Sequence, residues 1–241
     1  MNAAHLLLIA CLCAGMFFSV YQRKLTLWGS VCGGILAYML YLGSGYAGVL
    51  MMAGFFVLGT GASQWRHQLK VRMGLAETDK GRRVASQVLA NAGVPAIAAL
   101  IAFSLPSQRE FCTVLIASAF ASATSDTLSS ELGNVYGRRF YHVLHWQKDV
   151  RGENGVISLE GSMAGLAGSA LIAFLFGCFA GFTPLVAIVM IAGMAGNLFD
   201  SVLGATLERK HVIDNDVVNF LNTLFAALVA GALLSASDFL G

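Results

Sequence analysis

The chain has 241 residues, of which 57% are hydrophobic and only 12% are charged. A soluble domain of this size carries about 25% charged residues, so the composition excludes an ordinary soluble enzyme and a disordered chain. The net charge of +2 gives no indication of nucleic-acid binding. The 27 glycines and only 3 prolines are instead typical of a packed helical membrane protein, in which glycine allows helices to approach closely.

Eight apolar segments follow one another along the chain, and each is close to the length of about 20 residues that a bilayer-spanning helix needs. The apolar runs are continuous rather than alternating, which argues against the strands of a β-barrel. No soluble domain or long linker separates them. We therefore predict one all-α, polytopic membrane domain over residues 1–241, with spans at about 3–21, 25–43, 45–63, 84–105, 111–132, 157–177, 184–205 and 217–237.

The basic residues are distributed unevenly between the connections. Fourteen of the 15 lie in odd-numbered connections, and only Arg109 lies in an even-numbered one. The positive-inside rule then predicts that the odd connections face the cytoplasm and that both termini lie outside it. These connections also hold most of the polar side chains. We expect an integral membrane protein of the bacterial inner-membrane type, with its active site facing the cytoplasm.

Polar residues inside the spans form a predicted layer near the cytoplasmic surface. Such groups are unfavourable in lipid and are functional candidates, although a single buried amide more often joins two helices. Asp126 and Asp200 lie at matching depths, and Glu131 lies about 140° from Asp126 around an ideal helix. Glu131 therefore joins the same cavity only if the helix breaks near Gly133. The amides of the layer are Asn91, Asn197, Asn219 and Asn222.

These side chains suit the handling of phosphate groups. Carboxylates are hard oxygen ligands that bind Mg²⁺, which in turn bridges to phosphate. Basic residues at 80, 82 and 83 suit polyphosphate, and helix starts with nearby glycine, as at Asn154 and Gly155, are natural phosphate sites. The chain has no Walker A motif, so a nucleotide site would not be a P-loop.

Several other features are assigned to packing or remain open. Gly161, Gly165 and Gly168 have the small-residue spacing of close helix packing. His142 and His145 lie in a stretch that mixes aromatic and basic residues, which is typical of a membrane-surface segment rather than a metal site. The role of Glu160, near the start of the sixth span, stays open, as do those of the two histidines.

Five segments together resemble a known family, and the resemblance covers about residues 50–235. They read DKGRR (79–83) with QVLANAG (87–93), ATSDTLSSELG (123–133), NGVISLEG (154–161), FDSVLGATLE (199–208) and NDVVNFLN (215–222). The family that they resemble is the transmembrane protein 19 family, also called domain of unknown function 92. It includes the plant phytyl-phosphate kinase of the vitamin E pathway.

The resemblance implies a membrane-embedded kinase that transfers the γ-phosphate of a nucleotide, often CTP, to a prenyl monophosphate such as phytyl or geranylgeranyl phosphate. On the motif positions, Asp126, Glu131 and Asp200 would carry Mg²⁺, and Lys80 would act with the two aspartates in catalysis. Phosphate groups would be bound by Lys80, Arg82, Arg83, Asn91, Asn154, Gly155, Asn219 and Asn222.

The sequence leaves two alternatives to a kinase. A transporter or flippase for a lipid or small anion also needs intramembrane charge, although the polar layer near one face weighs against it. A scaffold without chemistry would tolerate asparagine at Asp126 and Asp200. Prenyl chain length, nucleotide preference, homo-oligomer formation and the distinction from a cytidylyltransferase are left open.

Overall fold

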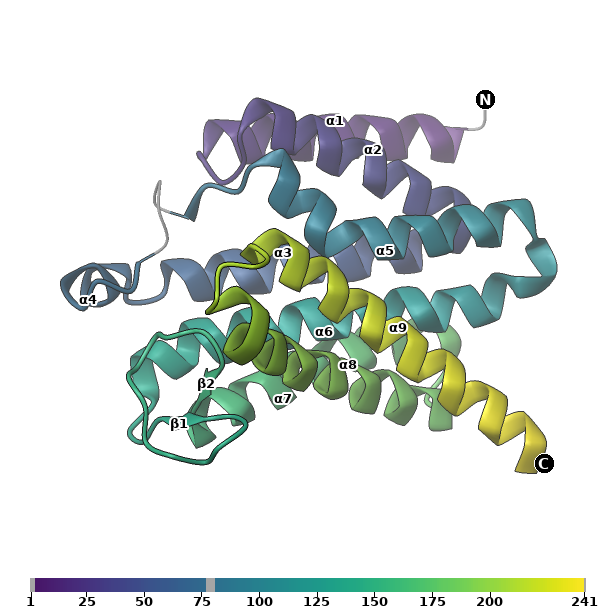
Figure 1. Cartoon of the computed structure of the whole chain (residues 1–241). Helices are drawn as coiled ribbons and strands as arrows, with labels where there is room; N and C mark the ends of the chain where they lie inside the picture. The colour runs from purple at the N-terminus through teal and green to yellow at the C-terminus, as the bar shows by residue number, and fades with distance from the viewer. Residues whose placement is uncertain (1–2, 77–80, 241) are drawn as a thin grey trace.

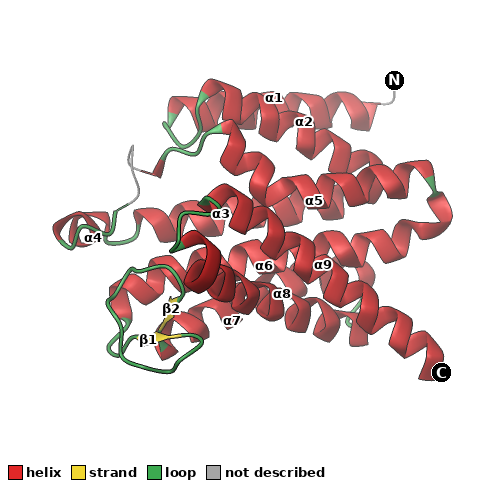
Figure 2. Cartoon of the chain, in the orientation of Figure 1, coloured by secondary structure: helices red, strands yellow, loops and turns green. Residues whose placement is uncertain are grey.

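The computed structural model describes residues 3–76 and 81–240, and nearly all of this part of the chain is helical (Figures 1 and 2). The only strands within these ranges, β1 (Tyr141–His142) and β2 (Val156–Ile157), form a small antiparallel pair. The helices are α1 (Ala3–Tyr21), α2 (Leu27–Ser44), α3 (Tyr46–Gln64), α4 (His67–Arg72), α5 (Ala85–Ser104), α6 (Arg109–Tyr136), α7 (Leu159–Ala180), α8 (Pro184–Leu203) and α9 (Asn215–Leu240).

The predicted all-α bundle is confirmed. Each of the eight predicted spans is a helix whose ends differ from the prediction by at most 4 residues. Among the described residues, 7 helices are long and apolar enough to cross a membrane, and α1 contributes a shorter apolar helix over His5–Tyr21. The bundle follows from the composition, because continuous apolar runs of this length are stable in lipid only as helices that satisfy their own backbone groups.

The long connections gather at one end of the bundle. Figure 1 shows α4 and the β1–β2 hairpin at that end, whereas both termini and the connection from α5 to α6 lie at the other. This arrangement is expected for an even number of spans with alternating directions. Which end faces the cytoplasm stays a prediction from the basic residues.

The centre of the bundle is α6, which packs against α3, α5, α7, α8 and α9. Its inner turns are fully buried and carry small side chains, such as Ala117, Ala119, Ala121 and Ala123. Small residues allow several helix backbones to approach one helix at once. Asp126 follows directly on this stretch, so the fold places it in the middle of the bundle.

The helix α6 continues through Gly133 to Tyr136 without a break. Glu131 nevertheless borders the same cavity as Asp126, so the predicted condition that a break is needed for this was wrong. A Cβ at Gly133 would lie 3.0 Å from the Cα of Gly161 in α7. Gly133 therefore allows two helices to cross closely and does not bend its own helix. The predicted packing role of Gly161 is confirmed, since a Cβ there would lie 2.8 Å from the backbone oxygen of Ser129.

Candidate functional site

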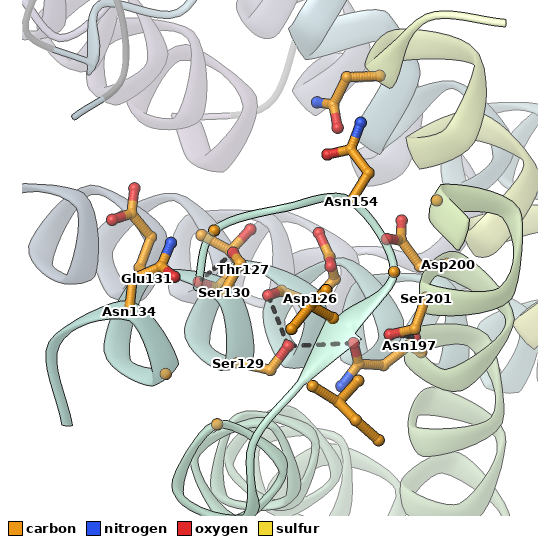
Figure 3. A pocket seen from close by; sticks show the side chains of 18 of the residues that line it. Asp126, Thr127, Ser129, Ser130, Glu131, Asn134, Asn154, Asn197, Asp200 and Ser201 are labelled. Carbon is orange, nitrogen blue, oxygen red and sulfur yellow. Dashed lines mark hydrogen bonds between the residues drawn. The ribbon is translucent and has the colours of Figure 1, made fainter. Parts of the chain in front are cut away.

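A polar cavity of about 300 Å³ opens between α5, α6, α8, α9 and the segment 152–158 (Figure 3). It lies at the end of the bundle that carries the long connections. Among its described lining residues are the charged or amide side chains of Arg83, Gln87, Asn91, Asp126, Glu131, Asn134, Glu153, Asn154, Asn197, Asp200, Glu208, Asn215 and Asn219.

Asp126 of α6 and Asp200 of α8 face each other in this cavity, and their side chains interact directly. The two aspartates, predicted to lie at matching depths, thus line the same cavity. Two carboxyl groups in contact within membrane-spanning helices are unfavourable unless a cation or a proton compensates their charge. This pair is therefore the strongest candidate for a functional centre in the described chain.

Hydrogen bonds hold α6 and α8 together beside the two aspartates. The amide nitrogen of Asn197 donates to Ser125 Oγ over 3.0 Å, and Ser129 Oγ donates to Asn197 Oδ1 over 3.2 Å. Ser129 Oγ also lies within 3.0 Å of the backbone oxygen of Asp126. Asn197 is buried and satisfied by these contacts, so its main effect is to fix the distance between the two helices.

Glu131 does not join the aspartates as a third ligand of one metal ion. It borders the cavity, but its Oε2 binds Lys70 Nζ in a buried ion pair. Lys70 also donates to the backbone oxygens of Ala62 and Ser63, at 3.0 and 2.7 Å, at the end of α3. Lys70 belongs to α4, so this ion pair holds the Glu131 carboxylate on the side of α4, and Figure 3 shows it apart from Asp126.

The basic residues near the start of α5 separate into different environments. Arg83 lines the cavity and is the single basic side chain in its described lining, with its guanidinium 4.9 Å from the centre of the Phe55 ring. Arg82 instead donates from Nε to the backbone oxygen of Leu25 over 3.2 Å and does not line the cavity. Lys80 lies outside the described residues.

The backbone explains why only one of the adjacent arginines faces the cavity. Residues 24–26 and 83 form a short parallel bridge, in which Arg83 N donates to Lys24 O over 2.9 Å and Thr26 N donates to Arg83 O over 3.0 Å. Successive side chains on extended backbone point in opposite directions. The connection between α1 and α2 thereby fixes the position of Arg83.

The segment 152–158 forms one wall of the cavity and brings Asn154 and Gly155 to it. Gly155 has a φ of +75°, and a Cβ there would lie 2.4 Å from the Cα of Ala205, so glycine is required for this close approach. The side chain of Asn154 hydrogen bonds to Glu208. The segment is therefore packed directly onto the end of α8.

An ion pair fixes the preceding part of this connection. Arg209 donates from Nη1 to Asp149 Oδ2 over 2.9 Å. The hydrogen bond from Arg209 lowers the pKa of Asp149 below its usual range, and a second one from the Val150 backbone nitrogen adds to it. This contact ties the β1–β2 connection to the residues that follow α8.

Glu208 also lines the cavity and is not among the residues predicted from the sequence. On a regular helix it would lie about 80° from Asp200, since eight residues advance 100° each. The structure has a π-helical turn over Gly204–Glu208, in which each residue advances less, so Glu208 returns to the face of Asp200. Glycine at 204 also allows this turn to approach Gly155, because a Cβ there would lie 2.8 Å from its backbone nitrogen.

Of the remaining predicted residues, some line the cavity, one lies buried behind it, and others lie outside its lining. Asn91 and Asn219 line the cavity, whereas Asn222 is fully buried behind Asp200. Glu160 lies 4.0 Å from Arg138 and outside the cavity lining. His142 and His145 stack on each other with ring centres 4.8 Å apart, and neither lines the cavity.

The donor set fits a hard divalent cation that is shared with phosphate. Within the described residues, no group of three or more His, Cys, Asp or Glu side chains is arranged to hold a metal ion. Mg²⁺ commonly takes only one or two protein carboxylates and completes its shell with water and substrate phosphates. Asp126 and Asp200, with amide oxygens nearby, match that pattern.

Comparisons with known proteins agree with this architecture. The family model described as integral membrane protein DUF92 matches residues 10–227, which extends the resemblance well before residue 50. No solved structure matches the chain. The chain is 34% identical to protein VTE6, chloroplastic, of Arabidopsis thaliana over 77% of its own length, and it spans only 58% of the length of that relative.

Two further relatives are membrane proteins of microorganisms. The chain is 31% identical to an uncharacterized membrane protein of Synechocystis sp., with 87% of this chain and 82% of the relative covered. It is 30% identical to an uncharacterized membrane protein of Methanocaldococcus jannaschii, with 92% and 90% covered. The chain belongs to the DUF92 family of integral membrane proteins.

Proposed function

We propose that the protein is an Mg²⁺-dependent prenyl-phosphate kinase that converts a prenyl monophosphate to its diphosphate. The observation that carries the proposal is the direct meeting of Asp126 and Asp200 in a polar cavity inside membrane-spanning helices. Arg83 lines the same cavity and supplies a positive charge. The family resemblance points to CTP as the phosphate donor and to phytyl or geranylgeranyl phosphate as the acceptor.

The proposed reaction needs positioning and charge neutralisation more than covalent help from the protein. An oxygen of the prenyl phosphate attacks the γ-phosphorus, and the bond from this phosphorus to the β–γ bridging oxygen breaks to release the nucleoside diphosphate. A phosphate oxygen is already an anionic nucleophile, so no side chain has to remove a proton. Bound Mg²⁺ would neutralise charge on the phosphates, with Asp126 and Asp200 as its protein ligands.

Other cavity groups have distinct proposed tasks. Arg83, fixed by its backbone bridge, binds phosphate oxygens. Asn91 and Asn219 contribute neutral hydrogen-bond donors on the side of α5 and α9, and Asn154 with the Gly155 backbone does so on the opposite wall. We propose that this face lies toward the cytoplasm, where nucleotides are available, as the distribution of basic residues predicts.

The test is product analysis with purified protein in lipid nanodiscs. The protein is incubated with γ-labelled CTP or ATP, Mg²⁺ and phytyl or geranylgeranyl phosphate, and labelled prenyl diphosphate is expected. Asp126→Asn and Asp200→Asn should each abolish it while the protein remains folded. Glu160→Gln is the matched control, because this carboxylate lies outside the cavity lining.

Two outcomes would redirect the assignment. A nucleotide-linked lipid in place of a diphosphate would identify a cytidylyltransferase. Absence of any lipid product with every pairing, together with uptake of a lipid or anion by proteoliposomes, would identify a transporter and overturn the kinase proposal.

A further inference from the structure

A second cavity of about 650 Å³ lies between α2, α5 and α9. Its walls are apolar and include Leu36 from α2, Leu89 and Ile97 from α5, and Leu221 from α9. Leu89 and Ile97 are about half exposed, so the cavity is a groove open toward the lipid. Its volume is in the range of small-molecule sites, which is about 300–1,000 Å³.

This groove adjoins the polar cavity along the first turns of α5 and α9. Ser86 borders the groove, and the next residue, Gln87, borders the polar cavity. Likewise Asp214 and Asp216 border the groove, whereas Asn215 between them borders the polar cavity. The two spaces therefore lie on either side of the first turns of α5 and α9.

Deeper along the groove, Gly93 of α5 faces the ring of Phe220 of α9. A Cβ added to Gly93 would lie 3.4 Å from the ring of Phe220, and both residues line the groove. Glycine at 93 keeps the groove open between the two helices, and the Phe220 ring forms part of its wall.

The two spaces differ in whether a basic side chain lines them. The charged residues in the described lining of the groove are Asp214 and Asp216, at its mouth, and both are acidic. The basic residue in the described lining of the polar cavity is Arg83. The polar cavity is also lined by the five carboxylates of Asp126, Glu131, Glu153, Asp200 and Glu208. An anionic phosphate is therefore attracted there only where Arg83 and a cation bound by Asp126 and Asp200 offset these charges, and the described lining of the groove offers no basic side chain.

We propose that the groove holds the isoprenoid tail of the prenyl phosphate while its phosphate lies beside Asp126, Asp200 and Arg83. This inference rests on the proposed kinase function and adds the location of the tail and the route by which substrate arrives laterally from the bilayer. Lipid is as apolar as the groove, so the tail gains little from burial there. The groove instead orients the phosphate, and orientation governs the rate of transfer.

The first test compares a long and a short acceptor in nanodiscs. Gly93→Phe fills the groove and is expected to lower kcat/KM for geranylgeranyl phosphate roughly tenfold or more, while activity with the five-carbon dimethylallyl phosphate is unchanged. Gly15→Phe is the matched control, because a Cβ there meets nothing within 4 Å. No change with the long acceptor, or an equal fall with both, would overturn the proposal.

A second variant distinguishes an effect on tail binding from misfolding of the protein. Phe220→Ala enlarges the groove and is expected to shift preference toward acceptors longer than 20 carbons, a gain that damaged protein cannot produce. An unchanged chain-length preference in this folded variant would contradict a role of the groove in tail binding.

A binding readout separates this proposal from the kinase assignment. Geranylgeranyl phosphate with a diazirine at the far end of its tail is photolysed with the protein, and adducts are expected in residues 89–97 and 217–221. Unlabelled geranylgeranyl phosphate should prevent them and excess phospholipid should not. Adducts elsewhere, or displacement by phospholipid alone, would overturn tail binding, whereas correct adducts without any diphosphate product would refute the kinase and leave the tail site supported.

Discussion

Asn222 holds the carboxylate of Asp200 through a hydrogen bond of 2.7 Å from Nδ2 to Oδ2. Its own Oδ1 accepts a hydrogen bond of 3.0 Å from Ser122 Oγ, so one amide connects α9, α8 and α6. Asn222 is fully buried and does not line the cavity, in contrast to the phosphate-binding role expected from its motif. Its position is that of a group that orients Asp200.

Removing this amide should therefore impair the site without removing a ligand. In Asn222→Leu the Asp200 carboxylate loses its donor, and we expect the Mg²⁺ requirement to rise and activity to fall about 10- to 100-fold, as for other groups that orient metal ligands. The measurement is the kinase rate as a function of Mg²⁺ concentration.

Thr223→Val is the control for this variant. Thr223 is also fully buried, but its hydroxyl hydrogen bonds only locally, to Phe220 O at 2.8 Å. We expect this substitution to leave the Mg²⁺ dependence unchanged. Equal Mg²⁺ curves for Asn222→Leu and the wild type would show that Asn222 does not orient a metal ligand.

The buried ion pair between Lys70 and Glu131 should dominate the stability of the α4 region. Breaking such a pair leaves one charge buried without its partner, which costs about 3–5 kcal/mol. We expect Lys70→Met and Glu131→Gln each to lower the free energy of unfolding by about this amount. The double variant Lys70→Met/Glu131→Leu should lose less than the sum, as unfolding in detergent by denaturant would measure.

The exposed pair of Arg138 and Glu160 provides a contrast within the same end of the bundle. The Arg138 side chain is 89% exposed and its Nε lies 4.0 Å from Glu160 Oε1. Exposed pairs contribute only about 0–1 kcal/mol, so Arg138→Ala should be nearly neutral. A loss as large as that of Lys70→Met would contradict the assignment of the stabilisation to the buried pair.

The spans and the two aspartates could be predicted from the sequence because both are visible in the hydropathy of neighbouring residues. A run of about 20 apolar residues is a helix in lipid whatever its neighbours are, and a carboxylate within such a run is conspicuous. Asp126 and Asp200 were found in this way. Their direct meeting required the packing of α6 against α8, which no local pattern contains.

Other site residues could not be predicted because their environment is created by the fold. Lys70 lies in a basic connection, where lysine is ordinarily a topology signal, yet it is 1% exposed and neutralises Glu131. Glu208 reaches the cavity only through the π-helical turn that follows Leu203. The glycines at 204 and 155 were the available signal, since they allow that turn to pack closely on the segment 152–158.

Gly165 should be essential for the distance between α6 and α7. A Cβ at this position would lie 2.7 Å from Asn197 Nδ2 and 2.9 Å from Ser125 Oγ, the two atoms that hydrogen bond beside the aspartates. Gly165→Ala is expected to destabilise the protein by about 1–3 kcal/mol and to lower kinase activity. Gly61→Ala, where a Cβ meets nothing within 4 Å, should change neither, and thermal unfolding with activity measured in parallel distinguishes the two.

The contact between Asp149 and Arg209 predicts a specific loss of stability in acid. The pKa of Asp149 is lower in the folded protein than in the unfolded chain, first because Arg209 donates a hydrogen bond to its carboxylate and then because Val150 N does. A carboxyl whose pKa is depressed by folding stabilises the protein above its unfolded pKa of 3.8, and this contribution disappears as the pH falls through the folded value.

We therefore expect the wild type to lose more thermal stability between pH 6 and pH 3 than Asp149→Asn, which cannot titrate at this position. Arg209→Gln should behave like Asp149→Asn, because it removes the donor with the largest effect on the Asp149 pKa. The unfolding temperature of each protein in detergent at several pH values is the measurement. The same pH dependence in all three proteins would mean that the ion pair between the β1–β2 connection and the end of α8 does not form in solution.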